Sequence, residues 1–92
     1  MQLLADQISK ALKTRPFSGS LRFDCGEAGS LVIADGAAFV GDQATDCTIT
    51  ITQDHLRSLL AGKLNPMMAM ATGKLRVSGN PAVALNLAKL LG

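Results

Sequence analysis

The sequence predicts a small α+β domain of two layers, an α/β fold in which helices cover one face of a mostly antiparallel β-sheet. The first observation is the segment 46–52, where apolar residues alternate with three threonines, as in a strand with one solvated face. The second is a set of amphipathic segments with helical spacing. The third is the length of 92 residues, which fits one domain covering residues 1–92.

Residues 3–13 are predicted to form the first helix. Its apolar stripe consists of Leu4, Ala5, Ile8, Ala11 and Leu12. Lys10, Lys13 and Arg15 lie near its C-terminal end, where positive charges suit the helix dipole, and Pro16 ends the helix. These cations either form a solvated helix end or contact an anionic headgroup.

Three short strands are predicted next. Residues 19–26 alternate between apolar and polar side chains, and residues 30–34 form a second strand. The pair Asp35-Gly36 indicates a two-residue hairpin, because both positions tolerate a positive φ. Residues 37–41 return as a third strand that carries Phe39. We therefore expect an antiparallel meander.

The fourth strand, residues 46–52, is followed by a helix. Its inward side chains are Cys47, Ile49 and Ile51. Thr52 or Asp54 can cap the helix, and Gly62 stops it. The apolar stripe of this helix consists of Leu56, Leu59 and Leu60.

Two Asn-Pro pairs mark the starts of two more helices. Asn65-Pro66 opens a short helix rich in methionine, which is followed by a fifth strand at 73–79. Asn80-Pro81 opens the last helix, residues 81–91, which is apolar nearly all round and should be covered on more than one side. The methionines either fill the core or form an adaptable wall of a binding site.

Composition argues against several classes of protein. The net charge of +2 is small, and the absence of Trp and Tyr leaves few surfaces on which bases could stack, so we expect no nucleic-acid partner. Cys25 and Cys47 are expected to be buried free thiols. One histidine and two separated cysteines are too few for a metal site. The first residues lack the layout of a signal peptide, and we expect a soluble cytoplasmic protein.

No catalytic constellation is recognisable. His55 stands beside Asp54 at the start of a predicted helix, where an exposed histidine is a simpler interpretation than a catalytic pair. The glycines follow neither the dinucleotide spacing nor the P-loop spacing. The sequence thus predicts no enzyme and no cofactor, with an activity based on His55 as the weakest hypothesis.

Four consecutive segments carry a resemblance to a known family. They are the strand 44–52, the leucine helix with its end at 62–66, the apolar turn 67–71 and the strand 73–80. Together they resemble the sterol-carrier-protein-2 (SCP-2) family, and the order of elements in the first half agrees. The chain is shorter than the better-known members, and Asn80 stands where an aspartate is common.

The resemblance implies a five-stranded sheet with helices on one face and an apolar tunnel between the layers. It implies a non-enzymatic lipid-binding or carrier module for a sterol, a fatty acid or a fatty acyl-CoA, with transient contact to a membrane surface left open. We expect the tunnel to be lined by Phe39, Ile49, Ile51, Leu60, Leu64, Met67, Met68, Met70, Leu87 and Leu91.

The alternative is an interaction or dimerisation module with a collapsed tunnel. In that case the apolar last helix packs on a partner, so the chain is a monomer or a homodimer. The energetics keep both hypotheses open, because an empty apolar cavity costs on the order of 24 cal/mol per Å³. A domain this small has to fill its tunnel with ligand, collapse it, or close it by dimerising.

Overall fold

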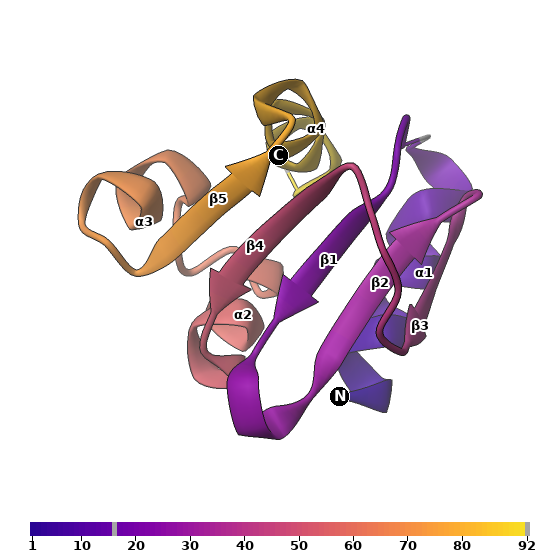
Figure 1. Ribbon diagram of the computed structural model, residues 1–92, viewed down its shortest axis with the longest axis horizontal. Coiled ribbons are helices and arrows are strands. Elements are labelled where there is room, and N and C mark those ends of the chain that lie inside the picture. Colours follow the sequence, from indigo (N-terminus) through magenta and orange to yellow (C-terminus); the bar gives the residue numbers. More distant parts are fainter. Residues whose placement is uncertain (16, 92) are drawn as a thin grey trace.

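The computed structural model describes residues 1–15 and 17–91 and shows a sheet with helices behind it (Figure 1). The predictions for Pro16 and for the side chain of Leu91 fall outside the described residues. The strands are β1 (Leu21–Asp24), β2 (Ser30–Ala34), β3 (Ala37–Val40), β4 (Cys47–Ile51) and β5 (Leu75–Gly79). The helices are α1 (Gln2–Thr14), the 3-10 turn η1 (Gly26–Ala28), α2 (Gln53–Leu60), α3 (Pro66–Ala71) and α4 (Pro81–Leu91).

The sheet has the strand order β3-β2-β1-β4-β5. Strands β1, β2 and β3 form the predicted antiparallel meander, with Asp35 and Gly36 at positive φ in the hairpin. Strands β4 and β5 are also antiparallel, whereas β1 and β4 are parallel. The prediction of a five-stranded, mostly antiparallel sheet is confirmed, and the parallel pair makes the sheet mixed.

The connection from β3 to β4 crosses the outer face of the sheet. It runs from the edge strand past β2 and β1, on the side opposite the helices (Figure 1). The Gly41 N–H donates to the Ser30 carbonyl at 3.1 Å, and Asp42 forms an ion pair with Arg22 of β1. Val32 is completely buried although it lies on this face. Part of the outer face is therefore covered, and the rest carries the threonines of β4.

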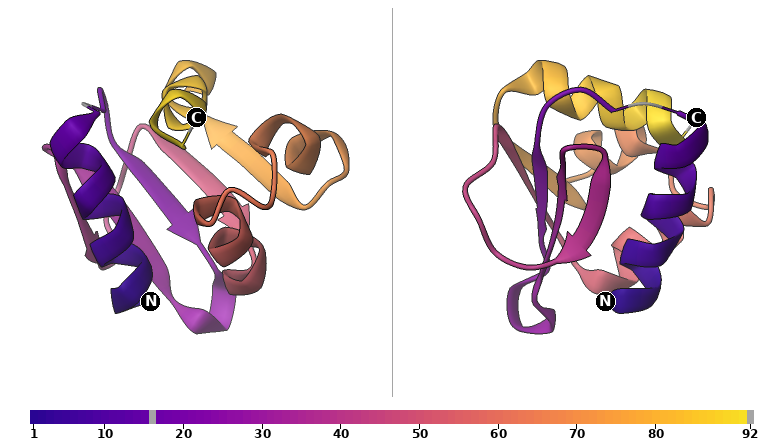
Figure 2. Two further views of the ribbon diagram at one scale, coloured as in Figure 1. Left: turned by 180° about the vertical axis from the view of Figure 1, so that it is seen from behind. Right: turned by 90° about the vertical axis from the view of Figure 1, so that its right-hand side faces the viewer.

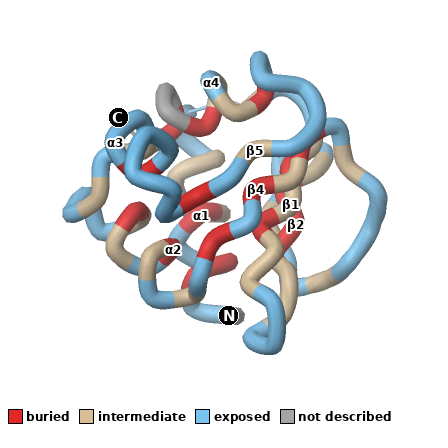
Figure 3. Tube along the Cα trace, turned by 60° about the vertical axis from the view of Figure 1, so that its left-hand side comes forward, coloured by how far each residue is buried: buried red, intermediate tan, exposed pale blue. Residues whose placement is uncertain are grey.

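The inner face holds the hydrophobic core. Seen from behind, α1, α2, α3 and α4 surround the middle of this face (Figure 2). The buried positions concentrate between the two layers (Figure 3). The largest completely buried side chains of this cluster are Phe23, Ile8, Leu21, Leu31, Ile33, Ile49, Leu56, Leu59 and Leu87. The prediction of a dry inner face is confirmed, whereas the outer face is solvated at Thr50 and covered at Val32.

Side-chain caps begin three of the helices where the sequence predicts them. The Thr52 hydroxyl accepts from the His55 N–H at 3.1 Å, so Thr52 rather than Asp54 caps α2. The Asn65 side chain accepts from the Met67 and Met68 N–H groups at 2.8 and 3.3 Å. At the start of α4, Asn80 accepts from the Ala82 N–H at 3.0 Å. Each cap satisfies donors that have no partner within the helix.

Candidate functional site

The apolar layer between sheet and helices contains half of the predicted tunnel residues. Ile49, Ile51 and Leu87 are between 1% and 3% exposed and belong to the core cluster. Leu60 and Leu64 are half-buried and pack against it. These five side chains lie in or against one apolar cluster and fill the space between the layers as packed core, and their role as the lining of a tunnel stays a prediction.

Phe39 lies on the other face of the sheet, which corrects its place in the predicted tunnel. It pairs with Val32 across β2 and β3, and Val32 pairs with Arg22. Since side chains alternate along a strand, these three residues share the outer face. The sequence pattern of β3 is too short and too uniformly apolar to show which face Phe39 takes. Leu91, also predicted, has a side chain outside the described residues.

The three methionines of α3 are largely exposed. Met67, Met68 and Met70 are 58%, 61% and 44% exposed, and Ala69 is the residue of α3 that is buried. Helix α3 lies at the edge of the molecule, beyond β5 (Figure 1). In this structure the methionines are therefore not core filler. Helix α3 contacts the apolar layer through Ala69, and its methionines point toward solvent.

Helix α3 is held mainly by its own caps and by the turn into β5. Thr72 Oγ1 donates to the Met68 carbonyl at 2.8 Å, and the Lys74 N–H donates to the Ala69 carbonyl at 2.8 Å. With one buried side chain, α3 contributes little apolar contact to the core. A helix of six residues with so little packing is an element that can move at a low cost in free energy.

Helix α4 buries one face and exposes part of another. Val83, Leu87 and Leu90 are at most 5% exposed, whereas Leu85 is 56% exposed. No other element of the described chain covers Leu85, and cover of this helix by a ligand or a partner subunit stays a prediction. Arg15 ties the end of α1 to α4, because its guanidinium donates to the Leu90 carbonyl at 3.1 Å.

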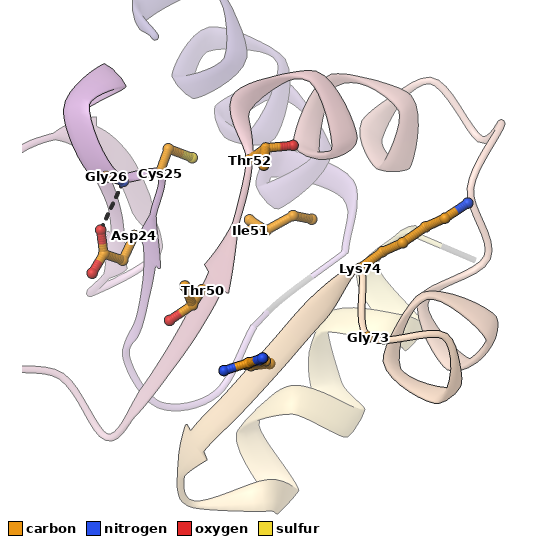
Figure 4. A pocket seen from close by; sticks show the side chains of 9 residues that line it. Asp24, Cys25, Gly26, Thr50, Ile51, Thr52, Gly73 and Lys74 are labelled. Atoms are coloured by element: carbon orange, nitrogen blue, oxygen red, sulfur yellow. Dashed lines mark hydrogen bonds between the residues drawn. The ribbon is translucent and has the colours of Figure 1, made fainter.

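A surface pocket of about 350 Å³ lies where β1 and β4 end and β5 begins (Figure 4). Its lining residues are Asp24, Cys25, Gly26, Thr50, Ile51, Thr52, Gly73, Lys74 and Arg76. The Asp24 carboxylate is engaged by the Gly26 N–H at 2.9 Å, and the Lys74 side chain extends away from it. Of the predicted tunnel residues, only Ile51 borders this pocket. The sequence patterns missed this polar and cationic region.

A second hollow, of about 560 Å³, lies on α1. It is lined by Leu3, Asp6, Gln7, Ser9, Lys10 and Lys13. Leu3 is 79% exposed there, and Lys10 and Lys13 are exposed. Cations and an acidic side chain are mixed on this face, and both interpretations of its lysines, a solvated helix end or a contact with an anionic headgroup, stay predictions.

Both cysteines are neutral thiols at ordinary pH. Burial raises the pKa of Cys47, and the adjacent Asp46 carboxylate raises it further. Burial also raises the pKa of Cys25, again with a contribution from the neighbouring acid, Asp24. Cys47 is buried as predicted, whereas Cys25 lies beyond the end of β1 and is only half-buried. A protonated thiol is a poor nucleophile and a poor metal ligand.

The residues weighed for catalysis do not form a pair. The Asp54 carboxylate lies 3.4 Å from Arg57, and the N–H of His55 serves the Thr52 cap. Within the described part of the chain, His55 Nδ1 has no hydrogen-bond partner. Among the same residues, no group of three metal-ligating side chains comes together. None of the described helices is both long enough and apolar enough to cross a membrane.

The fold and this site define a class of protein. It is a two-layer α+β domain with a mixed five-stranded sheet, an apolar layer under four helices, and one weakly packed helix at its edge. The model of the SCP-2 sterol transfer family matches residues 1–92. The chain belongs to this family.

Known relatives agree with this assignment. Sterol carrier protein 2 of Oryctolagus cuniculus is 45% identical over 49 residues, which cover 53% of this chain and 9% of the relative. The match thus spans about a tenth of the length of that curated relative.

Solved structures share the fold over nearly the whole chain. Sterol carrier protein 2 of Aedes aegypti in complex with palmitate has a TM-score of 0.80 at 21% identity, covering 97% of this chain and 91% of that one. The apo form from Yarrowia lipolytica has a TM-score of 0.68 at 28% identity, covering 95% and 75%.

Proposed function

We propose that this chain is a non-enzymatic lipid-binding module that holds a fatty acid, a sterol or a fatty acyl-CoA between its helices and its sheet. The observation that carries the proposal is the continuous apolar layer under four helices, of which α3 is anchored by one buried residue. The palmitate complex of the Aedes aegypti protein, which has the same fold, supports a fatty-acid ligand.

The proposed site opens when α3 moves away from the layer. In the closed state the space is filled by side chains such as Ile49 and Leu87, which avoids the cost of an empty cavity. A ligand gains about 0.8 kcal/mol per buried methylene, so ten methylenes contribute around 8 kcal/mol before the entropic costs. Affinities near micromolar follow once these costs are subtracted.

The exposed methionines suit this role. Methionine is unbranched and polarizable, so its side chain can pack against ligands of different shapes. In the proposed bound state, Met67, Met68 and Met70 turn from solvent onto the ligand. The exposed surface of these three side chains is then removed from water, which adds to the binding free energy.

A titration with a fluorescent long-chain fatty acid tests the proposal. We expect saturable binding by the wild type and at least tenfold weaker binding by Met68→Lys, because a charged group in the apolar site is costly to desolvate. Leu87 is unsuitable for such a test, since its buried side chain is part of the folded core.

The matched control is Leu3→Lys. Leu3 is exposed on α1, so this variant adds the same charge to a solvated surface and should bind like the wild type. Circular dichroism checks that both variants are folded. Saturable binding that is equal in all three proteins would refute the proposed site.

A further inference from the structure

The two edge strands of the sheet, β3 and β5, differ in how their outward backbone groups are used. In an antiparallel ladder, every second residue directs its N–H and C=O groups away from the neighbouring strand. The Gly41 N–H donates to β2, so the outward groups of β3 belong to Ala38 and Val40. The Ser9 hydroxyl of α1 donates to the Ala38 carbonyl at 3.2 Å, and α1 packs against β3. Helix α1 therefore covers this edge.

The edge at β5, the last strand of the sheet in Figure 1, has no such cover. The Asn80 N–H donates to the Asp46 carbonyl at 2.9 Å, which continues the register of β4 and β5. Counted along the ladder from this bond, Leu75 and Val77 are the residues that direct their backbone groups outward. Helix α3 accepts the N–H of Lys74, which precedes the strand. Among the residues that the structure describes, no group bonds the outward N–H and C=O groups of β5. Such an edge can pair with a further extended segment.

The side chains of β5 indicate which kind of segment fits this edge. Val77 lies opposite the buried Ile49 and so faces the inner layer, yet it is only half-buried. Arg76 lies opposite Thr50 on the outer face and is exposed. Side chains of an added strand alternate in step with β5, so that one lies beside Val77 and the next beside Arg76. An apolar residue suits the first position.

The charge around this edge is positive. All seven acidic residues of the chain lie at or before Asp54, and five of the nine lysines and arginines follow it. Lys63, Lys74 and Arg76 are exposed, and in the part of the chain that the structure describes none of them forms an ion pair. An acidic residue therefore suits the position beside Arg76. A second copy of this chain fits the edge less well, because a twofold interface would bring the same cations together.

We propose that the free edge of β5 binds an extended segment of a partner protein in which acidic and apolar residues alternate. The backbone of the segment bonds the outward N–H and C=O groups of Leu75 and Val77, as in β-strand addition. Its apolar side chains cover Val77 on the inner face, and its acidic side chains lie beside Arg76 on the outer face. Such binding goes beyond the proposed lipid-binding function and is independent of it, because it uses the backbone edge of the sheet.

Fluorescence anisotropy tests the proposal with a labelled peptide of about six residues, in which glutamate alternates with valine. We expect saturable binding, and binding at least about tenfold weaker when lysine replaces glutamate. Two further peptides are methylated on the backbone nitrogens of all valines or of all glutamates, which removes the donors of one edge or of the other. One of these two should bind at least about tenfold more weakly than the unmodified peptide, and the other should bind like it.

Val77→Pro tests the edge from the side of the protein. Proline lacks the N–H that faces outward and keeps the ladder to β4, so we expect a folded variant that binds the glutamate peptide at least about tenfold more weakly. Val40→Pro is the matched control, because the Val40 N–H faces outward on the edge that α1 covers. It should bind the peptide like the wild type. Circular dichroism checks both folds.

Arg76→Glu tests the charge and does not depend on how proline is tolerated. It should weaken binding of the glutamate peptide about tenfold and strengthen binding of the lysine peptide. Lys10→Glu, an exposed position on α1, makes the same change of sign away from β5 and should leave both affinities unchanged. Glutamate-peptide binding by Arg76→Glu that equals the wild type would refute the proposed partner chemistry.

Amide exchange followed by NMR locates the bound peptide. The Leu75 and Val77 amides should exchange at least about tenfold more slowly in the complex, and the Val40 amide should keep its rate. Protection of Val40 instead, equal loss of binding in both methylated peptides, or no binding at all would overturn the proposal. A dimer that Val77→Pro dissociates, seen by light scattering, would assign the edge to a second copy and would also overturn it.

Discussion

At the scale of single residues, the junction of β4 and β5 depends on the absence of a side chain at Gly79. Its φ is +98°, and a Cβ there would lie 2.5 Å from the Asp46 carbonyl oxygen and 3.1 Å from the Cys47 Cα. The same carbonyl accepts the Asn80 N–H at 2.9 Å. The close approach thus fixes both the end of β5 and the start of α4.

We predict that Gly79→Ala lowers the free energy of unfolding by about 2–5 kcal/mol, through the positive φ and the backbone clash together. Gly62→Ala is the matched control, because Gly62 has a φ of +77° with no atom within 4 Å of the added Cβ. It should cost about 1 kcal/mol. Urea unfolding measures both variants, and equal losses would contradict the role given to the clash.

At the scale of elements, α3 differs from the other helices in what stabilises it. Its packing rests on Ala69, whereas α2 buries Leu56 and Leu59. The Asn65 side chain, which accepts from two backbone N–H groups, therefore supplies a large share of the stability of α3. This dependence on local hydrogen bonds explains how α3 could move without unfolding the core.

We predict that Asn65→Ala destabilises α3 by about 1 kcal/mol, so amide exchange in α3 becomes about fivefold faster. The amides of β4 should keep the exchange rate of the wild type. Asn80→Ala is the control, because it removes the cap of α4 instead. Hydrogen exchange followed by NMR gives the rates, and an unchanged α3 in Asn65→Ala would argue against the local stabilisation.

At the scale of the whole molecule, ligand binding and stability are linked. When a ligand enters the closed layer between sheet and helices, contacts between side chains are replaced by contacts with the ligand. The unfolded chain has no layer of this kind, so the ligand binds only the folded state. A ligand that binds only the folded state raises the free energy of unfolding by about 2.7 kcal/mol at a hundredfold excess over Kd.

For a domain of this size, that increase should raise the Tm by about 10–20 °C. Differential scanning fluorimetry with and without palmitate measures the shift. Met68→Lys should show a much smaller shift at the same concentration of palmitate. Shifts of the same size in both proteins would place the ligand away from α3.

Much of the fold could be predicted from local signals in the sequence. The Asp35-Gly36 hairpin, the caps at Asn65 and Asn80, and the threonine face of β4 act over a few residues, so the sequence alone reveals them. The direction of the inward side chains of β4 could be predicted from the alternation of polar and apolar residues along this strand. The prediction that Ile49 and Ile51 face inward is correct for that reason.

The candidate site was predicted less well, because it depends on contacts between distant segments. Phe39 stands in a uniformly apolar strand, and only its pairing with Val32 shows that it faces outward. The methionines have the composition of a core, yet the edge position of α3 leaves them exposed.

The sequence by itself determined the order of the elements, the caps and the one-sided sheet, since periodicity and turn chemistry are local properties. Only the tertiary structure decided that β1 pairs in parallel with β4, which face Phe39 takes, and that α3 stands at the edge between Lys63 and Lys74. These features arise from packing among segments far apart in the chain. Helix α3 shows the difference between local and tertiary information most clearly. The sequence specifies its methionines, and the position of α3 at the edge of the core leaves them exposed.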